Sequence, residues 1–305
     1  MSAPALSPLV SFRFRNILYA TDFSPCSEKA LSFVRGIATH FGSTVHAIHV
    51  LAPRAQLAAV VDPAPELDTE LQEAERQMGS LTLRPEMKGL TRQVFVERGP
   101  FWHVLERVIQ ERDIDLIVAG THGRRGLKKL VMGSVAEEIF RRARCPVMTI
   151  GPHISTDGIA KGRIGLILYA GHSETEIAEG ENCALSYATG LARESEANLV
   201  LLHVLPRTED DFLARRESMA KDVRQQLLNR ANLISRGARL AYPPLPIVTF
   251  GTPAVEILRV AQQQRAELIV MAVHYKGIGL AAHLPWTTTH RVICEAPCPV
   301  LTVRD

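Results

Sequence analysis

The sequence predicts an α/β fold made of two tandem doubly wound, Rossmann-like domains, each a five-stranded parallel sheet flanked by helices. Two observations carry this prediction: the chain repeats itself, and each copy alternates short apolar segments with longer helical ones. The length of 305 residues also exceeds that of a typical single domain.

The repeat is visible as four short segments that recur in the same order. I-L-Y-A at 17–20 returns at 167–170, and H-V-L at 49–51 returns at 203–205. L-I-V at 116–118 returns at 268–270, and C-P-V at 145–147 returns at 298–300. The offsets of 150, 154, 152 and 153 residues are nearly constant, so the whole unit is duplicated with small insertions.

Each copy predicts strands and helices in alternation. In the first copy we expect strands at 16–21, 44–50, 91–97, 114–120 and 146–150, and helices at 24–41, 66–83, 101–112 and 134–144. Strands separated by helices of ten or more residues favour βαβ units and a parallel sheet covered on both faces.

The second copy follows the same order, with its longest helix at about 209–235. Residues 152–161 mix Pro, Gly, Ser, Thr and Asp, which is typical of a linker. We therefore predict domains at 12–151 and 163–305.

Composition excludes several classes of protein. A net charge of +3 is too small for a nucleic-acid-binding face. No apolar run reaches 18 residues, and the first fifteen residues lack the apolar segment of a signal peptide, so no membrane association is expected. Five scattered cysteines favour a reduced, cytoplasmic protein, and Cys294 and Cys298 lack the further ligands of a metal site.

Candidate binding residues follow the first and fourth strands, because ligands of doubly wound sheets bind beyond the strands' carboxyl ends. Thr21 and Asp22 follow the first strand. Gly120-Thr121-His122-Gly123 follows the fourth, and nine residues later Gly133-Ser134 opens a helix. Glycines let backbone N–H groups approach an anion, and a helix N-terminus attracts one. Four basic residues between the glycine pairs add positive charge: Arg124, Arg125, Lys128 and Lys129.

The same residues also admit an interpretation without a ligand. Ser134 and Glu137 form the S-x-x-E pattern of a capping box, and Asp22 is placed to cap the helix after it. Basic residues on a loop are commonly a solvated surface. The spacing alone leaves both interpretations open.

A family resemblance favours the binding site. The spacing Gly120-x2-Gly123-x9-Gly133-Ser134 matches the G-x2-G-x9-G-[S/T] signature, so the chain resembles the ATP-binding universal stress proteins from about residue 12 to 303. Asp22, His49-Val50 and the two C-P-V segments are similar to that family as well. The resemblance implies an adenine nucleotide alpha hydrolase-like fold with strand order 3-2-1-4-5, and it implies ATP as the ligand, with or without Mg²⁺.

The resemblance also implies a role for each site residue. Ala20, Thr21 and Asp22 would contact the adenosine end of ATP. Val50 and Ala119 would line the adenine pocket. The ribose and phosphates would be held by Gly120, Gly123, Gly133, Ser134 and Val135.

The second copy lacks these residues. His172 and Gly171 replace Asp22 and Thr21, Ala272 and Tyr275 replace Gly120 and Gly123, and Trp286-Thr287 replaces Gly133-Ser134. G-I-G-L-A-A at 277–282 resembles a dinucleotide motif, but it follows the fourth strand of its unit instead of the first. We therefore expect ATP in the first domain only.

Three functions remain open: an ATP-responsive stress-response module, a slow ATPase or self-phosphorylating protein, and a structural stress protein that binds no nucleotide. No Walker A, G-x-S-x-G or H-E-x-x-H motif occurs, and the counterpart of His122, His274, persists without the site. The first function, without enzymatic activity, is therefore favoured. The apolar last strands, 146–150 and 299–303, predict a pseudo-dimer of the two domains or a homodimer.

Overall fold

The computed structural model describes residues 12–53, 64–121, 132–156, 158–171, 183–205, 213–273 and 288–304. The chain divides into two compact units. The first unit is Phe14–Arg163. The second unit begins at Ile164 and also includes Phe12 and Arg13 from the N-terminal segment. No helix in the described ranges has the length and apolarity that a membrane crossing requires.

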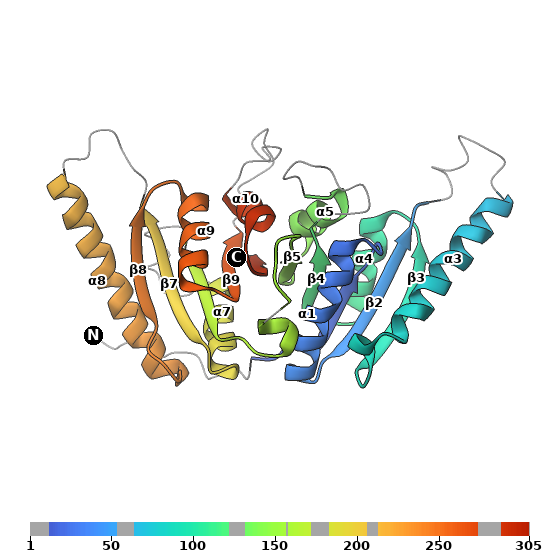
Figure 1. Cartoon of the computed structure of the whole chain (residues 1–305), viewed down its shortest axis with the longest axis horizontal. Coiled ribbons are helices and arrows are strands. Elements are labelled where there is room, and N and C mark those ends of the chain that lie inside the picture. The colour runs from blue at the N-terminus through green and yellow to red at the C-terminus, as the bar shows by residue number, and fades with distance from the viewer. Residues whose placement is uncertain are drawn as a thin grey trace. The chain divides into compact units, whose positions relative to one another are not determined.

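The first unit is built on a parallel sheet of order β3-β2-β1-β4-β5 (Figure 1). Its strands are β1 (Asn16–Ala20), β2 (Thr44–Leu51), β3 (Thr91–Arg98), β4 (Leu116–Gly120) and β5 (Val147–Ile150). The predicted strand order is confirmed. Because β1 lies between β2 and β4, the chain leaves β1 in one direction and later returns on its other side, which creates the switch point of the sheet.

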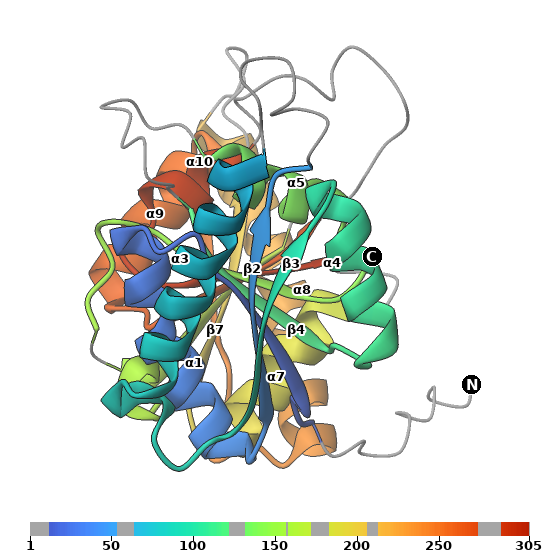
Figure 2. The ribbon, with the colours of Figure 1, turned by 90° about the vertical axis from the view of Figure 1, so that its right-hand side faces the viewer.

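Helices cover both faces of this sheet: α1 (Pro25–Phe41) and α3 (Ala64–Thr82) one face, α4 (Phe101–Glu111) and α5 (Ser134–Arg142) the other (Figure 2). A short 3₁₀ turn, η1 (Pro85–Met87), precedes β3. The start of α1 is set by Ser24, whose hydroxyl accepts from the Ser27 N–H, and by Pro25 at the first helical position. Its end is set by Gly42, at φ 65°.

The core between the sheet and α4 and α5 is apolar and closely packed. Leu18, Ile48 and Ile117 from the strands meet Leu105 and Ile139 from the helices, and all are at most 1% exposed. Burying a side chain of this size contributes about 1.5–3 kcal/mol. This cluster includes Ala20 and Ala119 near the carboxyl ends of β1 and β4, so the apolar core extends up to the site region.

The segment after β5, whose composition predicts a linker, packs against α1. Ile154 and Ile159 are 3% and 2% exposed, and η2 (Gly158–Lys161) lies against α1. The Lys29 ammonium donates to the Pro152 and Ile154 carbonyls at 2.8 and 3.0 Å. A Cβ on Gly36 would lie 1.7 Å from the Ile159 carbonyl oxygen, so only glycine permits this contact.

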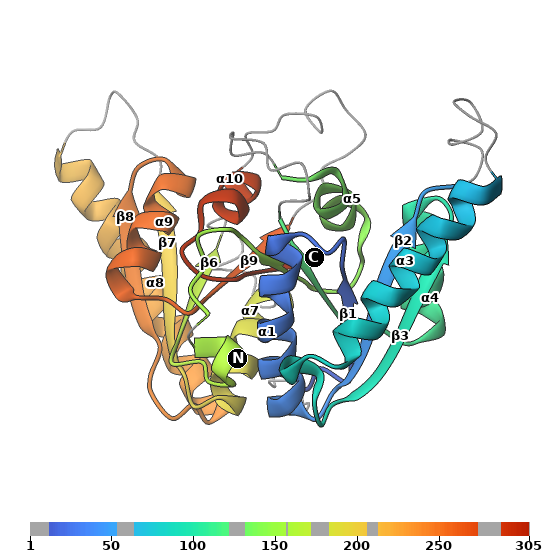
Figure 3. The ribbon, with the colours of Figure 1, turned by 45° about the vertical axis from the view of Figure 1, so that its right-hand side comes forward.

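The second unit repeats the architecture, with a parallel sheet of order β8-β7-β6-β9-β10. Its strands are β6 (Leu166–Gly171), β7 (Asn198–Leu205), β8 (Leu245–Phe250), β9 (Leu268–Val273) and β10 (Val300–Arg304). Its helices are α7 (Cys183–Glu194), α8 (Leu213–Ala238), α9 (Pro253–Gln264) and α10 (Thr288–Glu295). α9 and α10 pack together (Figure 3).

The N-terminal segment completes the surface of α7. The Phe12 ring meets the Tyr187 ring edge to face, with centroids 5.1 Å apart. A Cβ on Gly190 would lie 2.6 Å from two atoms of the Phe12 ring. Gly190 aligns with Gly36, so each unit uses the same helical glycine to admit a neighbouring segment.

Candidate functional site

The ends of β1 and β4 form the centre of the candidate site in the first unit. Ala20 pairs directly with Ala119 across the two strands. Ala20 also pairs with Ile48 of β2, so Val50 lies two residues beyond the end of β1. The structure brings Ala20, Val50 and Ala119 to one apolar face, where Val50 is partly buried against the core cluster that contains Ala20 and Ala119.

Asp22 lies in the turn between β1 and α1. Its Oδ1 accepts from the Ser24 N–H at 3.0 Å, and Ser24, not Asp22, caps α1. The expectation that Asp22 itself caps the helix is therefore wrong. Asp22 instead accepts a hydrogen bond from the backbone of the capping residue, Ser24. Burial acts to raise the pKa of the Asp22 carboxyl, but hydrogen bonds from Ser24 and Ser27 outweigh burial and lower that pKa from 3.8.

Thr21 anchors the same turn from the strand side. Its N–H donates to the Ile48 carbonyl at 3.0 Å, and its carbonyl lies 2.7 Å from His49 Nδ1. Its hydroxyl donates to Ser27 Oγ at 3.1 Å and accepts from the Phe23 N–H at 3.0 Å. Thr21 is 6% exposed, so its side chain points into the protein, where its hydrogen bonds stabilise the turn.

The two ends of the glycine loop meet in the structure. The Thr121 N–H donates to the Ile150 carbonyl at 3.0 Å, and the Gly133 N–H donates to the Thr121 carbonyl at 2.8 Å. The start of α5 is therefore fixed beside the end of β4. Gly123, His122 and the four basic residues lie outside the described residues.

Gly120 has a packing reason to be glycine. A Cβ at this position would lie 2.7 Å from the Cys26 carbonyl carbon and from the Ser27 nitrogen. The absent side chain therefore admits the first turn of α1. The approach of an anion, the reason expected from sequence, is not needed to explain Gly120.

The N-terminus of α5 lacks a side-chain cap. Gly133 is the capping residue, and its carbonyl accepts from the Glu137 N–H at 2.9 Å. The capping box expected from Ser134 and Glu137 is therefore wrong; Ser134 is the first helical residue and is exposed. Glu137 pairs with Arg141 at 2.9 Å instead. The N–H groups of the first helical turn point out of the helix without an intrahelical acceptor, at its positive end.

The aligned region of the second unit differs. Ala272 stands where the first unit has Gly120, and α7 begins at Cys183, which aligns with Lys29 in the second turn of α1. His172, Tyr275 and Trp286-Thr287 lie outside the described residues. Here a small cavity of about 20 Å³ opens on the α7 and α8 side of β6 and β7.

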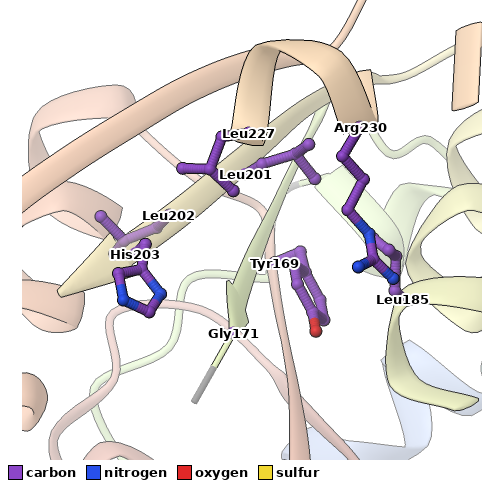
Figure 4. A pocket seen from close by; sticks show the side chains of 8 residues that line it. All are labelled: Tyr169, Gly171, Leu185, Leu201, Leu202, His203, Leu227 and Arg230. Carbon is purple, nitrogen blue, oxygen red and sulfur yellow. The ribbon is translucent and has the colours of Figure 1, made fainter. Parts of the chain in front are cut away.

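Leucines and three polar side chains line this cavity (Figure 4). Its lining residues are Tyr169, Gly171, Leu185, Leu201, Leu202, His203, Leu227 and Arg230. A single water needs about 10–15 Å³, so the cavity has room for about one water. It is far too small for a nucleotide, and it lies on the face opposite to the one that Val50 marks in the first unit.

Two sets of residues in the site were not predicted from sequence. Ser24 and Ser27 form the polar network beneath Asp22, and Phe23 packs on His49. The repeat of H-V-L at 49–51 and 203–205 was a signal that His49 matters, but nothing in the sequence indicated its partner. Nothing in the sequence indicated a role for Phe23, because its left-handed backbone conformation cannot be predicted from its residue type.

Fold and site together define a tandem doubly wound α/β protein whose first unit holds a glycine loop at the switch point. A family model described as the universal stress protein family matches residues 13–151 and 179–304. The chain therefore belongs to the universal stress protein family.

Relatives and solved structures agree with this assignment. A universal stress protein of Methanocaldococcus jannaschii is 26% identical over 157 residues, which is 46% of this chain and 97% of the relative. One from Mycobacterium bovis is 29% identical over 196 residues, 63% of either chain. The crystal structure of a universal stress protein from Archaeoglobus fulgidus has a TM-score of 0.68 at 20% identity, over 96% of this chain and 99% of the other. That likeness shows the tandem fold.

Proposed function

We propose that this protein is an ATP-responsive stress protein that binds one ATP per chain, in the first unit. The observation that carries the proposal is the hydrogen bond from the Gly133 N–H to the Thr121 carbonyl, at 2.8 Å. It sets the uncapped N-terminus of α5 beside the end of β4, at the switch point where doubly wound sheets take their ligands.

The chemistry of the described residues fits a nucleotide. The N–H groups of Ser134, Val135 and Ala136 and the exposed Ser134 hydroxyl would hold phosphate oxygens. The Asp22 carboxylate, ionised at neutral pH, would accept from ribose hydroxyls or the adenine amine. Val50 would contact the adenine ring.

The rest of the predicted site completes this arrangement. Gly123 and the basic residues 124, 125, 128 and 129 belong to the proposal through the signature spacing. Any Mg²⁺ would enter with ATP and be held chiefly by phosphates and waters, as this ion prefers.

Differences in the second unit support a single site. Ala272 adds a methyl group at the end of β9, and the sequence places Tyr275 where the signature requires glycine. The cavity of this unit has room for about one water.

Titration calorimetry of the full chain with Mg-ATP tests the proposal, and we expect one site per chain. Gly123→Tyr, which copies Tyr275, should abolish binding at unchanged melting temperature. Tyr275→Gly is the matched control and should leave binding unchanged. Two equivalent sites, or none, would contradict the proposal. Phosphate release in the same samples separates a binding module from a slow ATPase.

The pairing of the two last strands belongs to the same proposal. β5 is V-M-T-I, and β10 is V-L-T-V before Arg304, and an apolar edge strand favours a strand partner. We expect cysteines introduced at Thr149 and Thr302 to cross-link within one chain. Cross-links only between chains would instead indicate a homodimer, and none at all would count against pairing.

A further inference from the structure

The turn that carries Asp22 contains a strained residue. Phe23 has φ 59°, a left-handed conformation that a bulky side chain rarely adopts. Glycine or asparagine would take it at lower cost. Such a conformation persists only where the surrounding structure holds it, and it is commonly found at functional sites.

One side chain, His49 of β2, holds this turn on both sides of Asp22. Its Nδ1 lies 2.7 Å from the Thr21 carbonyl oxygen. A carbonyl oxygen only accepts, so Nδ1 carries the hydrogen. The Phe23 ring packs on the imidazole, with centroids 4.7 Å apart and planes at 41°. The residue before Asp22 and the residue after it are thus both fixed by one imidazole that is 9% exposed.

We infer that His49 and Phe23 are positioning residues that preorganise the Asp22 carboxylate for the nucleotide. This inference rests on the proposed function, because it assigns how the same site is held ready. With the turn fixed in advance, binding loses less conformational freedom. Without His49, the buried Thr21 carbonyl would lack its donor and the strained Phe23 its ring contact, so the turn would relax.

The second unit offers a natural contrast. His203 aligns with His49, but the sequence places Gly171 and Ser173 where the first unit has Thr21 and Phe23. The histidine persists where serine stands in place of Phe23. His203→Leu is therefore a matched control for His49→Leu: the same change, at the same place in the sheet, away from the proposed ATP site.

The dissociation constant for ATP is measured for wild type, His49→Leu, His49→Asn and His203→Leu. We expect His49→Leu to bind about tenfold more weakly, the usual effect of leaving one buried acceptor unpaired. His49→Asn should recover most of the affinity, since its amide N–H can stand near the position of Nδ1. His203→Leu should bind as wild type does. Wild-type affinity in His49→Leu would overturn the inference, as would equal weakening in His49→Leu and His49→Asn.

Phe23 has its own test in Phe23→Gly, which adopts φ 59° freely but lacks the ring. We expect several-fold weaker ATP binding from a folded protein. A changed melting temperature with an unchanged dissociation constant would overturn the role assigned to Phe23.

A nucleotide-free readout separates failure of this inference from failure of the proposed function. The Ser24 N–H bonds to Asp22 Oδ1, so its hydrogen exchange, followed by NMR, reports whether the carboxylate is held. It should exchange faster in His49→Leu than in wild type. If wild type binds no ATP, the proposed function fails. Equal exchange rates would overturn the positioning inference by themselves.

Discussion

Ser24 and Ser134 are two serines at helix starts with different tasks. Ser24 caps α1 through its hydroxyl, whereas Ser134 is the first residue inside α5 and caps nothing. A short S-x-x-E pattern cannot distinguish these cases, because the capping residue is fixed by the backbone conformation at Gly133 and not by the serine.

Two alanine substitutions make this difference measurable. Ser24→Ala should lower the free energy of unfolding by about 1 kcal/mol, the usual loss for an N-cap. Ser134→Ala should leave that free energy unchanged and weaken ATP binding. Urea unfolding and calorimetry on both variants provide the check. Equal destabilisation by the two variants would restore the capping interpretation of Ser134.

Asp22 predicts a pH dependence of stability. The pKa of its carboxyl is lowered in the folded state, so the ionised group stabilises the fold above its unfolded pKa, near 3.8. This contribution is lost as the pH falls through the folded pKa. The stability difference between wild type and Asp22→Asn should therefore be constant above about pH 5 and shrink below pH 4. Urea unfolding at several pH values measures it, and a difference that grows in acid would contradict the argument.

At the scale of elements, the contact between β4 and α1 depends on a glycine. Gly120→Ala would place a methyl group 2.7 Å from the backbone of Cys26 and Ser27. Overpacking of this kind costs about 1–3 kcal/mol, so thermal unfolding should occur at a lower temperature. Gly79→Ala is the control: it lies on the exposed face of α3 with open space around it, and alanine there should stabilise by up to about 1 kcal/mol. Unchanged stability of Gly120→Ala would show that α1 shifts at little cost.

Most elements could be predicted because strands and helices have different periods. The strand expected at 16–21 is β1 (Asn16–Ala20), and the helix expected at 101–112 is α4 (Phe101–Glu111). The packing of the segment after β5 could not be predicted, for a physical reason. Its Pro, Gly and Ser content predicts a linker, but two isoleucines too far apart to form a pattern, Ile154 and Ile159, bury it against α1.

The candidate site was predictable in part. Signature spacing placed Gly120 and Gly133-Ser134 at the ends of one loop, and the structure brings those ends together through Thr121 and Gly133. What could not be predicted was the support beneath Asp22. It depends on a left-handed backbone at Phe23 and on contacts between residues 28 positions apart, Thr21 and His49. Residue type alone encodes neither.

At the scale of the whole molecule, two copies of one fold differ at the strand ends where the first copy carries its candidate site. The sheets keep the same strand order, and the C-P-V segments keep their place. The differences that bear on the proposed site are Ala272 in place of Gly120, the later start of α7, and the residues that align with the signature. The first copy carries the glycines of the signature, and the second copy has Ala272, Tyr275 and Trp286 at the aligned positions.

The N-terminal segment should contribute to the stability of the second unit. Phe12→Ala should lower that stability by roughly 1–2 kcal/mol, because an edge-to-face pair contributes about 0.5–1.5 kcal/mol beyond its buried area. Hydrogen exchange should rise in α7 and stay unchanged in α1. Faster hydrogen exchange in α1 alone would contradict this prediction, because it would show that Phe12 stabilises the first unit instead of the second.

The place of Phe12 also bears on the order in which the protein is made. Phe12 leaves the ribosome before any residue of α7 is made, so its ring can pack only after α7 (Cys183–Glu194) has emerged. The first unit has its own sheet within Phe14–Arg163 and can assemble while synthesis continues. The second unit is complete only when Phe12, the earliest described residue of the chain, packs on α7, the first helix of that unit. A gene fragment that starts at Ile164 would therefore yield a second unit with Tyr187 and Gly190 uncovered, and supplying the N-terminal segment as a peptide should restore it.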